Sequence, residues 1–270
     1  MPRYILDVPA GSRPLALVTG ASAGIGRVFA NRLAASGHDL IVVARDAARL
    51  EALADELTLQ HGAHVEVLAS DLARDDGMRR VADRIAQEPR LAVLVNNAGF
   101  ATRGRLATRP VAEQATMLEL HIMAPMLLTR AALPGMLERK RGWIINVSSV
   151  ASFTFSAGNV NYASSKAYQR IFSEALGLEL AGTGVRVQAL CPGFTHTEFH
   201  ARAGIDKSTL PGWAWLDAGR VVDESLAQIA ANGPVVCVPT KRFKLIVLLM
   251  RFLPLWVMAP IRAAYGRRRT

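Results

Sequence analysis

The segment NYASSKAY (161–168) places a tyrosine and a lysine four residues apart, at Tyr162 and Lys166. On a helix, this spacing puts the two side chains one turn apart on the same face. A phenol has a pKa of about 10, so proton exchange at neutral pH requires about 4 kcal/mol of preferential stabilisation of the phenolate. The positive charge of a neighbouring ammonium stabilises the phenolate over the neutral phenol. The same pattern also occurs on ordinary polar helix faces, so its meaning depends on the rest of the chain.

A glycine-rich segment, TGASAGIG (19–26), directly follows the apolar run LALVT (15–19) and opens a helical pattern. Gly20 permits a tight turn, while Gly24 and Gly26 allow backbone and helix to approach a pyrophosphate at the helix N-terminus. In this context the segment predicts a nucleotide-binding loop, although many glycine-rich turns bind nothing. Three residues separate its first two glycines, unlike the G-x-G-x-x-G spacing.

Apolar runs and helical patterns alternate along the chain. Strands are expected at 15–19, 39–44, 64–69, 91–95, 143–148 and 185–190, with helices near 28–36, 46–60, 76–87, 111–132 and 161–181. Repeated units of this length specify right-handed crossovers and a parallel sheet covered on both faces. We therefore predict an α/β protein with one doubly wound, three-layer α/β/α domain, whose ligands bind beyond the carboxyl ends of the strands.

Composition excludes several classes of protein. With 51% hydrophobic and 20% charged residues, the chain is expected to fold. Cys191 and Cys237 are too few for a disulfide framework, and the N-terminus has no signal-peptide segment, so a cytoplasmic location is expected. Residues 241–270 carry eight Lys or Arg and no Asp or Glu, which leaves a net charge of +2 for residues 1–240. This argues against nucleic-acid binding and for a local anionic contact.

The T-G-x-x-x-G-x-G spacing resembles the short-chain dehydrogenase/reductase family, and four more segments support the resemblance. NNAG (96–99) follows the fourth expected strand, SS (148–149) ends the fifth, YASSK (162–166) matches Y-x-x-x-K, and PGFTHT (192–197) follows the sixth. Ser149 lies 13 residues before Tyr162, the family's usual interval. The resemblance covers about 14–198. It implies a Rossmann-type domain over 1–240 and a homodimer or homotetramer, while the charge of residues 241–270 predicts that they form a basic, apolar C-terminal extension.

The resemblance also implies a catalytic set. Tyr162 would donate a proton as hydride reaches a carbonyl carbon, Ser149 would hold the substrate oxygen, and Lys166 would hydrogen-bond the nicotinamide ribose. The residues expected at the cofactor are Gly20, Ser22, Gly24, Ile25, Gly26, Arg45, Asp71, Asn97, Ala98, Gly99, Tyr162, Lys166, Pro192, Gly193, Thr195 and Thr197. No metal site is predicted.

The end of the second expected strand indicates which nicotinamide cofactor is used. An acidic residue there would bond the adenosine ribose hydroxyls and repel a phosphate. The chain instead has Ala44 and then Arg45, whose guanidinium can hold a 2′-phosphate through paired bonds. NADP(H) is expected over NAD(H), although Arg45 could also be a solvated residue opening a helix. Asp71 is expected at the adenine or as a helix cap.

His121 departs from the family pattern. It lies 28 residues before Ser149, within LELHIMAP (118–125), where the family usually has an Asn. In the family, that site offers its backbone carbonyl to a water that relays protons to the lysine, a role that survives a change of side chain. The imidazole could also join the relay, because it titrates near neutral pH. The alternative is a packed histidine without a catalytic part.

The residues after the P-G segment, about 194–219, resemble the family's substrate loop. Apolar side chains there and after the active serine suggest a lipophilic substrate, unless they pack beneath the loop. They are Phe194, Phe199, Trp213, Trp215 and Leu216, together with Phe153 and Phe155.

The apolar run 245–258 is broken by Arg251 and Pro254 and is shorter than the roughly 20 residues that span a bilayer. It is expected to lie on the inner membrane face, to form a lobe beside the pocket, or to complete a dimer interface. The ending VMAPIRAAYGRR (257–268) loosely resembles actinobacterial family members that reduce very long-chain β-keto lipids.

Together these features predict an NADPH-dependent reductase of a hydrophobic ketone, such as a fatty or β-ketoacyl lipid, with steroid, polyketide and small xenobiotic ketones left open. A 3-oxoacyl group on an acidic carrier protein is the alternative substrate, since the basic tail could dock the carrier. A non-catalytic NADP(H)-binding regulatory or membrane scaffold protein is the alternative from another class.

Overall fold

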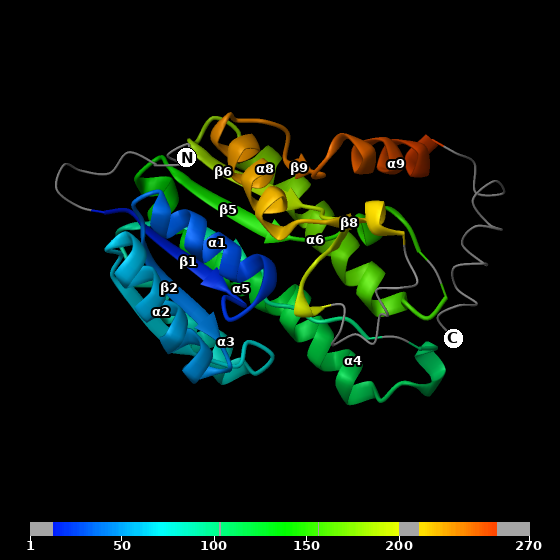
Figure 1. The fold of residues 1–270 in the computed structure, drawn as a ribbon, viewed down its shortest axis with the longest axis horizontal. Helices are drawn as coiled ribbons and strands as arrows, with labels where there is room; N and C mark the ends of the chain where they lie inside the picture. The colour runs from blue at the N-terminus through cyan, green and yellow to red at the C-terminus, as the bar shows by residue number, and fades with distance from the viewer. Residues whose placement is uncertain (1–12, 103, 156, 200–210, 253–270) are drawn as a thin grey trace.

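The computed structural model describes residues 13–102, 104–155, 157–199 and 211–252. Its centre is a seven-stranded sheet in the order β3-β2-β1-β4-β5-β6-β9, with every pairing parallel (Figure 1). The strands are β1 (Leu15–Thr19), β2 (Asp39–Ala44), β3 (Val65–Ala69), β4 (Leu91–Asn96), β5 (Gly142–Val147), β6 (Val185–Leu190) and β9 (Val236–Cys237). The strand order reverses at β1 and β4, so the protein is a doubly wound Rossmann-type α/β domain.

Helices cover both faces of the sheet (Figure 1). They are α1 (Gly24–Ala35), α2 (Ala47–His61), α3 (Asp75–Ala86), α4 (Val111–Leu118), α5 (Ala124–Glu138), α6 (Val160–Glu179), α8 (Ala218–Ala230) and α9 (Lys241–Phe252). Neighbouring residues of a strand point to opposite faces, so Val18 packs with α1, α2 and α8, while Leu17 packs with α3, α5 and α6. Because both faces are covered, the strands are continuous apolar runs.

The long helix expected near 111–132 is divided. A π-helical turn, Glu119–Met123, separates α4 from α5 and contains the fully buried His121. By length and composition, the run Val111–Glu138 would be apolar enough to cross a membrane. Leu128 and Met136 of α5 are nevertheless packed in the core against the sheet, as the helices of an α/β protein are.

The expected substrate loop contains two short strands. β7 (Phe194–Thr195) pairs in parallel with β8 (Trp215–Leu216), so the two ends of the loop are tied together. Neither α8 nor β9 is among the elements expected from the sequence. With only two residues, β9 is too short for a pattern to reveal.

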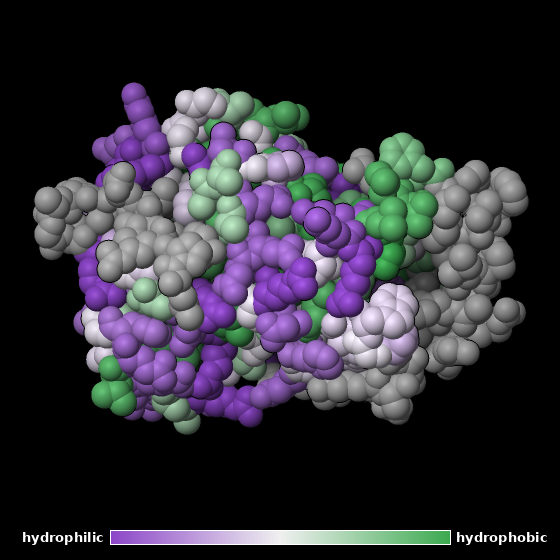
Figure 2. All heavy atoms as spheres, turned by 45° about the horizontal axis from the view of Figure 1, so that its top comes forward, coloured by the Kyte–Doolittle hydropathy of each residue, from purple (hydrophilic) through white to green (hydrophobic). Residues whose placement is uncertain are grey.

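Part of the C-terminal extension packs on the domain. Phe243 and Val247 of α9 belong to the same core cluster as the sheet, whereas Leu245, Leu248, Leu249 and Phe252 are 48–77% exposed. Figure 2 shows the resulting apolar area over α9. The expectations for residues 253–270, including Pro254 and the VMAPIRAAYGRR ending, lie outside the described residues.

Candidate active site

The glycine-rich loop between β1 and α1 can be built only from glycines at its critical positions. Gly20 and Gly24 adopt left-handed φ angles of +64° and +56°. At Gly26, an added Cβ would lie 2.3 Å from the carbonyl oxygen of Gly20. The loop and the start of α1 are therefore in direct backbone contact.

The N-terminus of α1 fits a bound anion. Its N-cap, Ala23, has no side chain that accepts from the first-turn N–H groups, and the first turn contains no acidic residue. These N–H groups and the positive end of the helix dipole thus remain for a ligand. The cofactor pyrophosphate predicted from the sequence suits this position. Ser22 lies partly buried in the loop before α1, and Ile25 lies partly buried in the first turn of α1.

The NNAG segment after β4 braces the glycine-rich loop. Asn97 Nδ2 donates to the carbonyls of Thr19, at 2.9 Å, and Gly20, at 3.2 Å. Thr19 Oγ1 accepts from the backbone N–H groups of Asn97 and Ala98 and donates to the Val95 carbonyl. Because these bonds join β1 to β4, the two strands at the reversal of the sheet hold the loop jointly.

Arg45 and Asp71 follow β2 and β3. Arg45 is exposed, and within the described part of the chain it forms no ion pair or hydrogen bond through its guanidinium. Its neighbour Arg49 instead pairs with Asp46 and Glu198. Asp71 Oδ1 accepts from the backbone N–H of Ala73 at 3.0 Å, which is a turn-stabilising bond. Arg45 is therefore an exposed cation at the end of β2 that pairs with no carboxylate of the described residues.

Ser149, Tyr162 and Lys166 lie at the carboxyl end of β5. Ser149 follows this strand and caps a 3-10 turn, where its Oγ accepts from the Ala151 N–H at 3.1 Å. Tyr162 and Lys166 occupy the first two turns of α6, with Lys166 Nζ 6.0 Å from the centroid of the Tyr162 ring. Ser148 Oγ donates to the Lys166 carbonyl at 2.7 Å and so ties α6 to the end of β5.

Lys166 is buried, and its ammonium is held by neutral acceptors. Its Nζ donates to the Val147 carbonyl at 2.8 Å and to Gln169 Oε1 at 2.9 Å. No carboxylate among the described residues pairs with it, and burial lowers the pKa of Lys166 to about 7. Gln169 is not among the site residues expected from the sequence, although its position three residues after Lys166 places both on one helix face.

His121 has both ring nitrogens engaged. Nε2 lies 3.2 Å from the Phe100 backbone nitrogen, which can only donate, so Nε2 accepts and the ring proton resides on Nδ1. Nδ1 donates to Ser165 Oγ at 2.9 Å, and Ser165 donates to the Tyr162 carbonyl. Burial, together with the charge of Lys166, lowers the pKa of His121 well below its ordinary value. This geometry favours the packed, neutral histidine over a titrating member of the relay.

Gly99 makes room for His121. A Cβ on this glycine would lie 2.7 Å from His121 Nε2. The last residue of the NNAG segment therefore lies against the imidazole that replaces the family's usual Asn.

The P-G segment after β6 closes the other side of the site. Thr195 Oγ1 donates to the Gly193 carbonyl at 3.0 Å and stabilises the turn that follows Pro192. Further on, Thr197 lies against the glycine-rich loop, since a Cβ on Gly24 would be 3.1 Å from the Thr197 side chain. The segment thus runs from the end of β6 to the nucleotide-binding loop.

The apolar residues of the substrate loop divide into two groups. The alternative that some of them pack beneath the loop is confirmed for Trp215 and Leu216, which are 6% and 2% exposed because the β7–β8 pair buries them. Trp215 packs between Phe194 and His196, at centroid distances of 5.8 and 5.1 Å. By contrast, Trp213 is 59% exposed.

Phe199 lies beside Tyr162, and the other phenylalanines of this region differ in their exposure. The ring of Phe199 is 6.1 Å from that of Tyr162, and Phe155 is 61% exposed. Phe153 instead packs on the core and under the guanidinium of Arg170, 4.8 Å away. Residues 200–210 of the loop lie outside the described residues.

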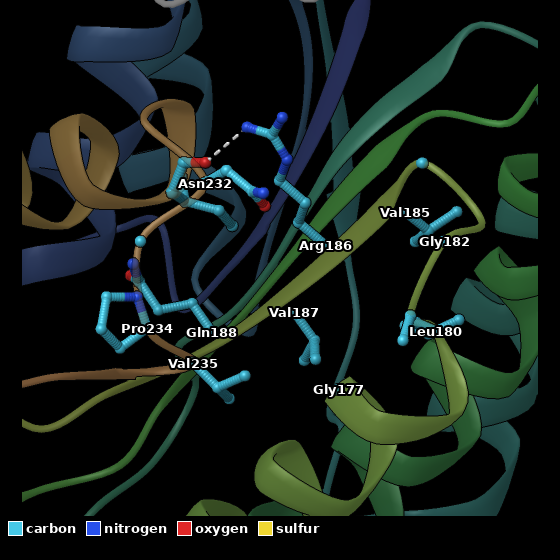
Figure 3. A pocket seen from close by; sticks show the side chains of 14 residues that line it. Gly177, Leu180, Gly182, Val185, Arg186, Val187, Gln188, Asn232, Pro234 and Val235 are labelled. Carbon is cyan, nitrogen blue, oxygen red and sulfur yellow. Dashed lines mark hydrogen bonds between the residues drawn. The ribbon is translucent and has the colours of Figure 1, made fainter.

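A crevice of about 430 Å³ lies at the other end of β6 (Figure 3). It is lined mainly by glycines and apolar residues. Its cation, Arg186, is engaged with the Ile229 and Ala230 carbonyls at the end of α8. The residues expected at the active site lie at the carboxyl ends of the strands, away from this crevice.

Comparison with known proteins agrees with this arrangement. Residues 14–207 match the family described as short chain dehydrogenase. A short chain dehydrogenase from Pseudocercospora fijiensis is 40% identical over 189 residues, 69% of this chain and 61% of that protein. The NADP-dependent 3-hydroxy acid dehydrogenase YdfG of Salmonella typhi is 41% identical over 189 residues, 68% of this chain and 74% of that protein.

Solved structures show the same fold. A short-chain dehydrogenase from Sphingobium yanoikuyae in complex with NADPH has a TM-score of 0.80 and 35% identity. The match covers 89% of this chain and 96% of that one.

Proposed function

The chain belongs to the short-chain dehydrogenase/reductase family of oxidoreductases, and we propose that it is an NADPH-dependent reductase of lipophilic ketones acting through Ser149, Tyr162 and Lys166. The observation that carries the proposal is a buried lysine with no carboxylate partner among the described residues, one helical turn from a tyrosine. This pair lies at the same sheet edge as a glycine-rich loop built to hold a nucleotide.

Lys166 and Tyr162 act as a coupled pair. Because burial lowers the pKa of Lys166 to about 7, its ammonium is not fully formed near neutrality when it stands alone. A phenolate one turn away favours the ammonium, and the ammonium favours the phenolate, so the pair titrates jointly. This coupling lets the phenol give up its proton at a pH far below its usual pKa of about 10.

The protein's groups then supply the proton and hold the substrate. When bound, NADPH supplies hydride to the carbonyl carbon. Tyr162 donates its hydroxyl proton to the carbonyl oxygen, and Ser149 donates a hydrogen bond that holds that oxygen. Ser149 suits this role because its Oγ already accepts from the Ala151 N–H, which leaves its O–H as the donor.

Two features support NADPH as the cofactor. Arg45 stands after Ala44 at the end of β2, exposed and without a partner in the described part of the chain. An Asp or Glu, which would repel a 2′-phosphate, is missing there. The relative named as NADP-dependent and the structural neighbour bound to NADPH support the same preference.

Apolar side chains support a lipophilic substrate. Phe199 lies beside Tyr162, and two further large apolar side chains, Phe155 after Ser149 and Trp213 in the substrate loop, are exposed. A fatty or β-ketoacyl lipid is the favoured substrate class, and a 3-oxoacyl group on a carrier protein is the alternative. Short polar ketones would leave this surface in water. Turnover of ketones of increasing chain length distinguishes these substrate classes.

We extend the proposal to the source of the substrate, an anionic membrane surface. Leu245, Leu248, Leu249 and Phe252 form one exposed stripe on α9, because they recur at i, i+3, i+4 and i+7. Lys241, Arg242 and Lys244 are exposed at the start of the helix, and residues 241–270 contain no acidic residue. Apolar side chains flanked by cations suit an anionic bilayer.

The decisive experiment measures NADPH consumption with a panel of ketones of increasing chain length, for the wild type and for Tyr162→Phe. We expect turnover that increases with chain length and is lost in the variant, while NADPH still binds. Cofactor binding without turnover of any ketone would support the non-catalytic alternative. Turnover of only carrier-linked 3-oxoacyl groups would identify the alternative substrate.

A further inference from the structure

We propose that Gln169 is a positioning residue that joins Lys166 to the main chain of His121 and directs the lysine ammonium toward Tyr162. Its Oε1 accepts from Lys166 Nζ at 2.9 Å, and its Nε2 donates to the His121 carbonyl at 2.9 Å. This inference rests on the proposed function, because it assumes that Lys166 acts on Tyr162.

The chemistry of its neighbours fixes the orientation of the Gln169 amide. An ammonium can only donate and a carbonyl can only accept, so the oxygen must face Lys166 and the nitrogen must face His121. The Gln169 and Lys166 residues are 2% and 4% exposed. Water therefore does not readily replace either bond, and loss of the amide leaves two buried groups unpaired.

The His121 carbonyl needs an outside donor because of the local sequence. In an α-helix, this carbonyl would accept from the N–H four residues later, which here is Pro125 and has none. The chain forms a π-helical turn at Glu119–Met123 instead. Gln169 reaches across from α6 and supplies the missing donor.

Gln169 also determines how Lys166 presents its charge. The ammonium has three N–H donors, and Val147 and Gln169 accept two of them. Both acceptors are neutral, so they orient the charge without cancelling it. The other titratable groups facing Lys166 are His121, kept neutral by burial, and Cys191, whose thiol pKa burial raises to about 11. The positive charge is thus left to act on Tyr162.

A buried network holds Gln169 itself in place. Its backbone carbonyl accepts from Ser173 Oγ at 2.7 Å, and Ser173 accepts from Asn146 Nδ2 at 2.9 Å. Asn146 in turn accepts from Asn96 at the end of β4. The main chain of Gln169 is therefore anchored to two central strands, which limits the movement of the residue whose side chain holds Lys166.

The test replaces Gln169 with Met, which is close in size but forms neither bond, and with Glu, which adds a negative charge beside the ammonium. We expect the kcat of Gln169→Met to fall about tenfold or more, with a smaller change in the KM for ketone, because the ammonium is misdirected. Both variants should displace the ionisation of the Tyr162 phenol to higher pH. In alcohol oxidation, where the phenolate is the base, the pH profile of kcat should also shift to higher pH.

Gln188→Met is the matched control. Gln188 is 1% exposed and exchanges two hydrogen bonds with Ser225 of α8, on the face of the sheet opposite to α6. The Gln188→Met variant should have a lower free energy of unfolding in urea than the wild type but the same pH profile of kcat. If Gln169→Met keeps the wild-type kcat and pH profile, or if Gln188→Met shifts the profile equally, the positioning role is wrong.

A second readout separates this inference from the proposed function. The phenol of Tyr162 can be titrated by ultraviolet absorbance, as the difference between each protein and its Tyr162→Phe counterpart, without any substrate. If the wild type reduces no ketone, the proposed function fails, but a displaced phenol titration in Gln169→Met, which adds no charge, would still support the positioning role. An unchanged titration in Gln169→Met would overturn that role even in an active enzyme.

Discussion

Phe243 of α9 lies against Gly193 of the P-G segment, so closely that a Cβ on the glycine would be 2.3 Å from the phenylalanine ring. The contact joins the C-terminal helix to the loop that follows β6 and lines the proposed nicotinamide site. The extension expected from the basic charge of 241–270 is therefore, in its described part, packed against the catalytic domain.

Gly193→Ala is expected to weaken both the fold and cofactor binding. The buried Phe243 ring must move to admit the methyl group, at a cost of about 1–3 kcal/mol in the free energy of unfolding. Urea unfolding and NADPH titration measure the two effects. Gly212→Ala is the control, because a Cβ there meets no atom within 4 Å. Similar losses in the two variants would show that the close contact is unimportant.

Arg45→Ala is expected to raise the Kd for NADPH about tenfold or more, since hydrogen bonds to charged groups contribute about 1.5–3 kcal/mol. The Kd for NADH should change little, because NADH lacks the 2′-phosphate. Arg49→Ala provides the control, since Arg49 already pairs with Asp46 and Glu198. Equal weakening of NADPH and NADH would contradict the role of Arg45.

The sequence predicted the positions of the central strands well. β1, β2 and β6 begin and end where expected, and β3, β4 and β5 differ by one residue at their ends. Burial on both faces makes each of them a short continuous apolar run, which is readable without tertiary information. The two-residue strands β7, β8 and β9 have no such pattern, because their pairing partners alone define them.

The site could be predicted only where its residues belong to one local motif. Tyr162 and Lys166 lie on one helix, and the glycine-rich loop is continuous, so spacing revealed both. Gln169 could not be recognised from spacing alone, because its role depends on Pro125 leaving the His121 carbonyl without a donor in another helix. The burial of Trp215 likewise could not be predicted, because it depends on the pairing of two loop ends that are distant in the sequence.

His121→Asn is expected to keep kcat within about threefold of the wild type, because the group that binds Gln169 is the main-chain carbonyl. The shorter side chain cannot bridge Phe100 and Ser165 as the imidazole does, so the free energy of unfolding should fall by about 1–3 kcal/mol. Kinetics and urea unfolding separate these effects. A large loss of kcat at an unchanged free energy of unfolding would show that the imidazole takes part in the proton relay.

The protein is expected to lose stability as the pH falls below about 6.5. Burial lowers the pKa of His38 to about 4 from 6.5, so the unfolded chain binds a proton that the folded chain does not. Stability is then complete above the unfolded pKa and decreases by roughly 3 kcal/mol between pH 6.5 and 4. In urea unfolding at pH 7 and 5, His38→Asn should reduce this decrease, whereas replacing the exposed His64 by Asn should not. The same decrease in both variants would rule out His38 as its source.

The last prediction concerns the apolar stripe of α9. Replacing Leu245 and Leu249 with Ser should reduce co-sedimentation with vesicles containing anionic lipid by about tenfold or more, because each buried leucine contributes about 1.5–3 kcal/mol. Both side chains are about half exposed, so the fold should tolerate the change. The control replaces Ile171 and Leu178, which are exposed on α6, by Ser and should bind as the wild type does.

Size-exclusion chromatography of the same variants distinguishes a membrane surface from a second copy of the chain. If the α9 variant binds vesicles normally but elutes as a smaller species, the stripe is a subunit interface and the membrane proposal is wrong. If vesicle binding is lost at an unchanged elution volume, the stripe contacts lipid. High salt should then weaken the wild-type binding, because the exposed cations at the start of α9 contribute through a screened attraction.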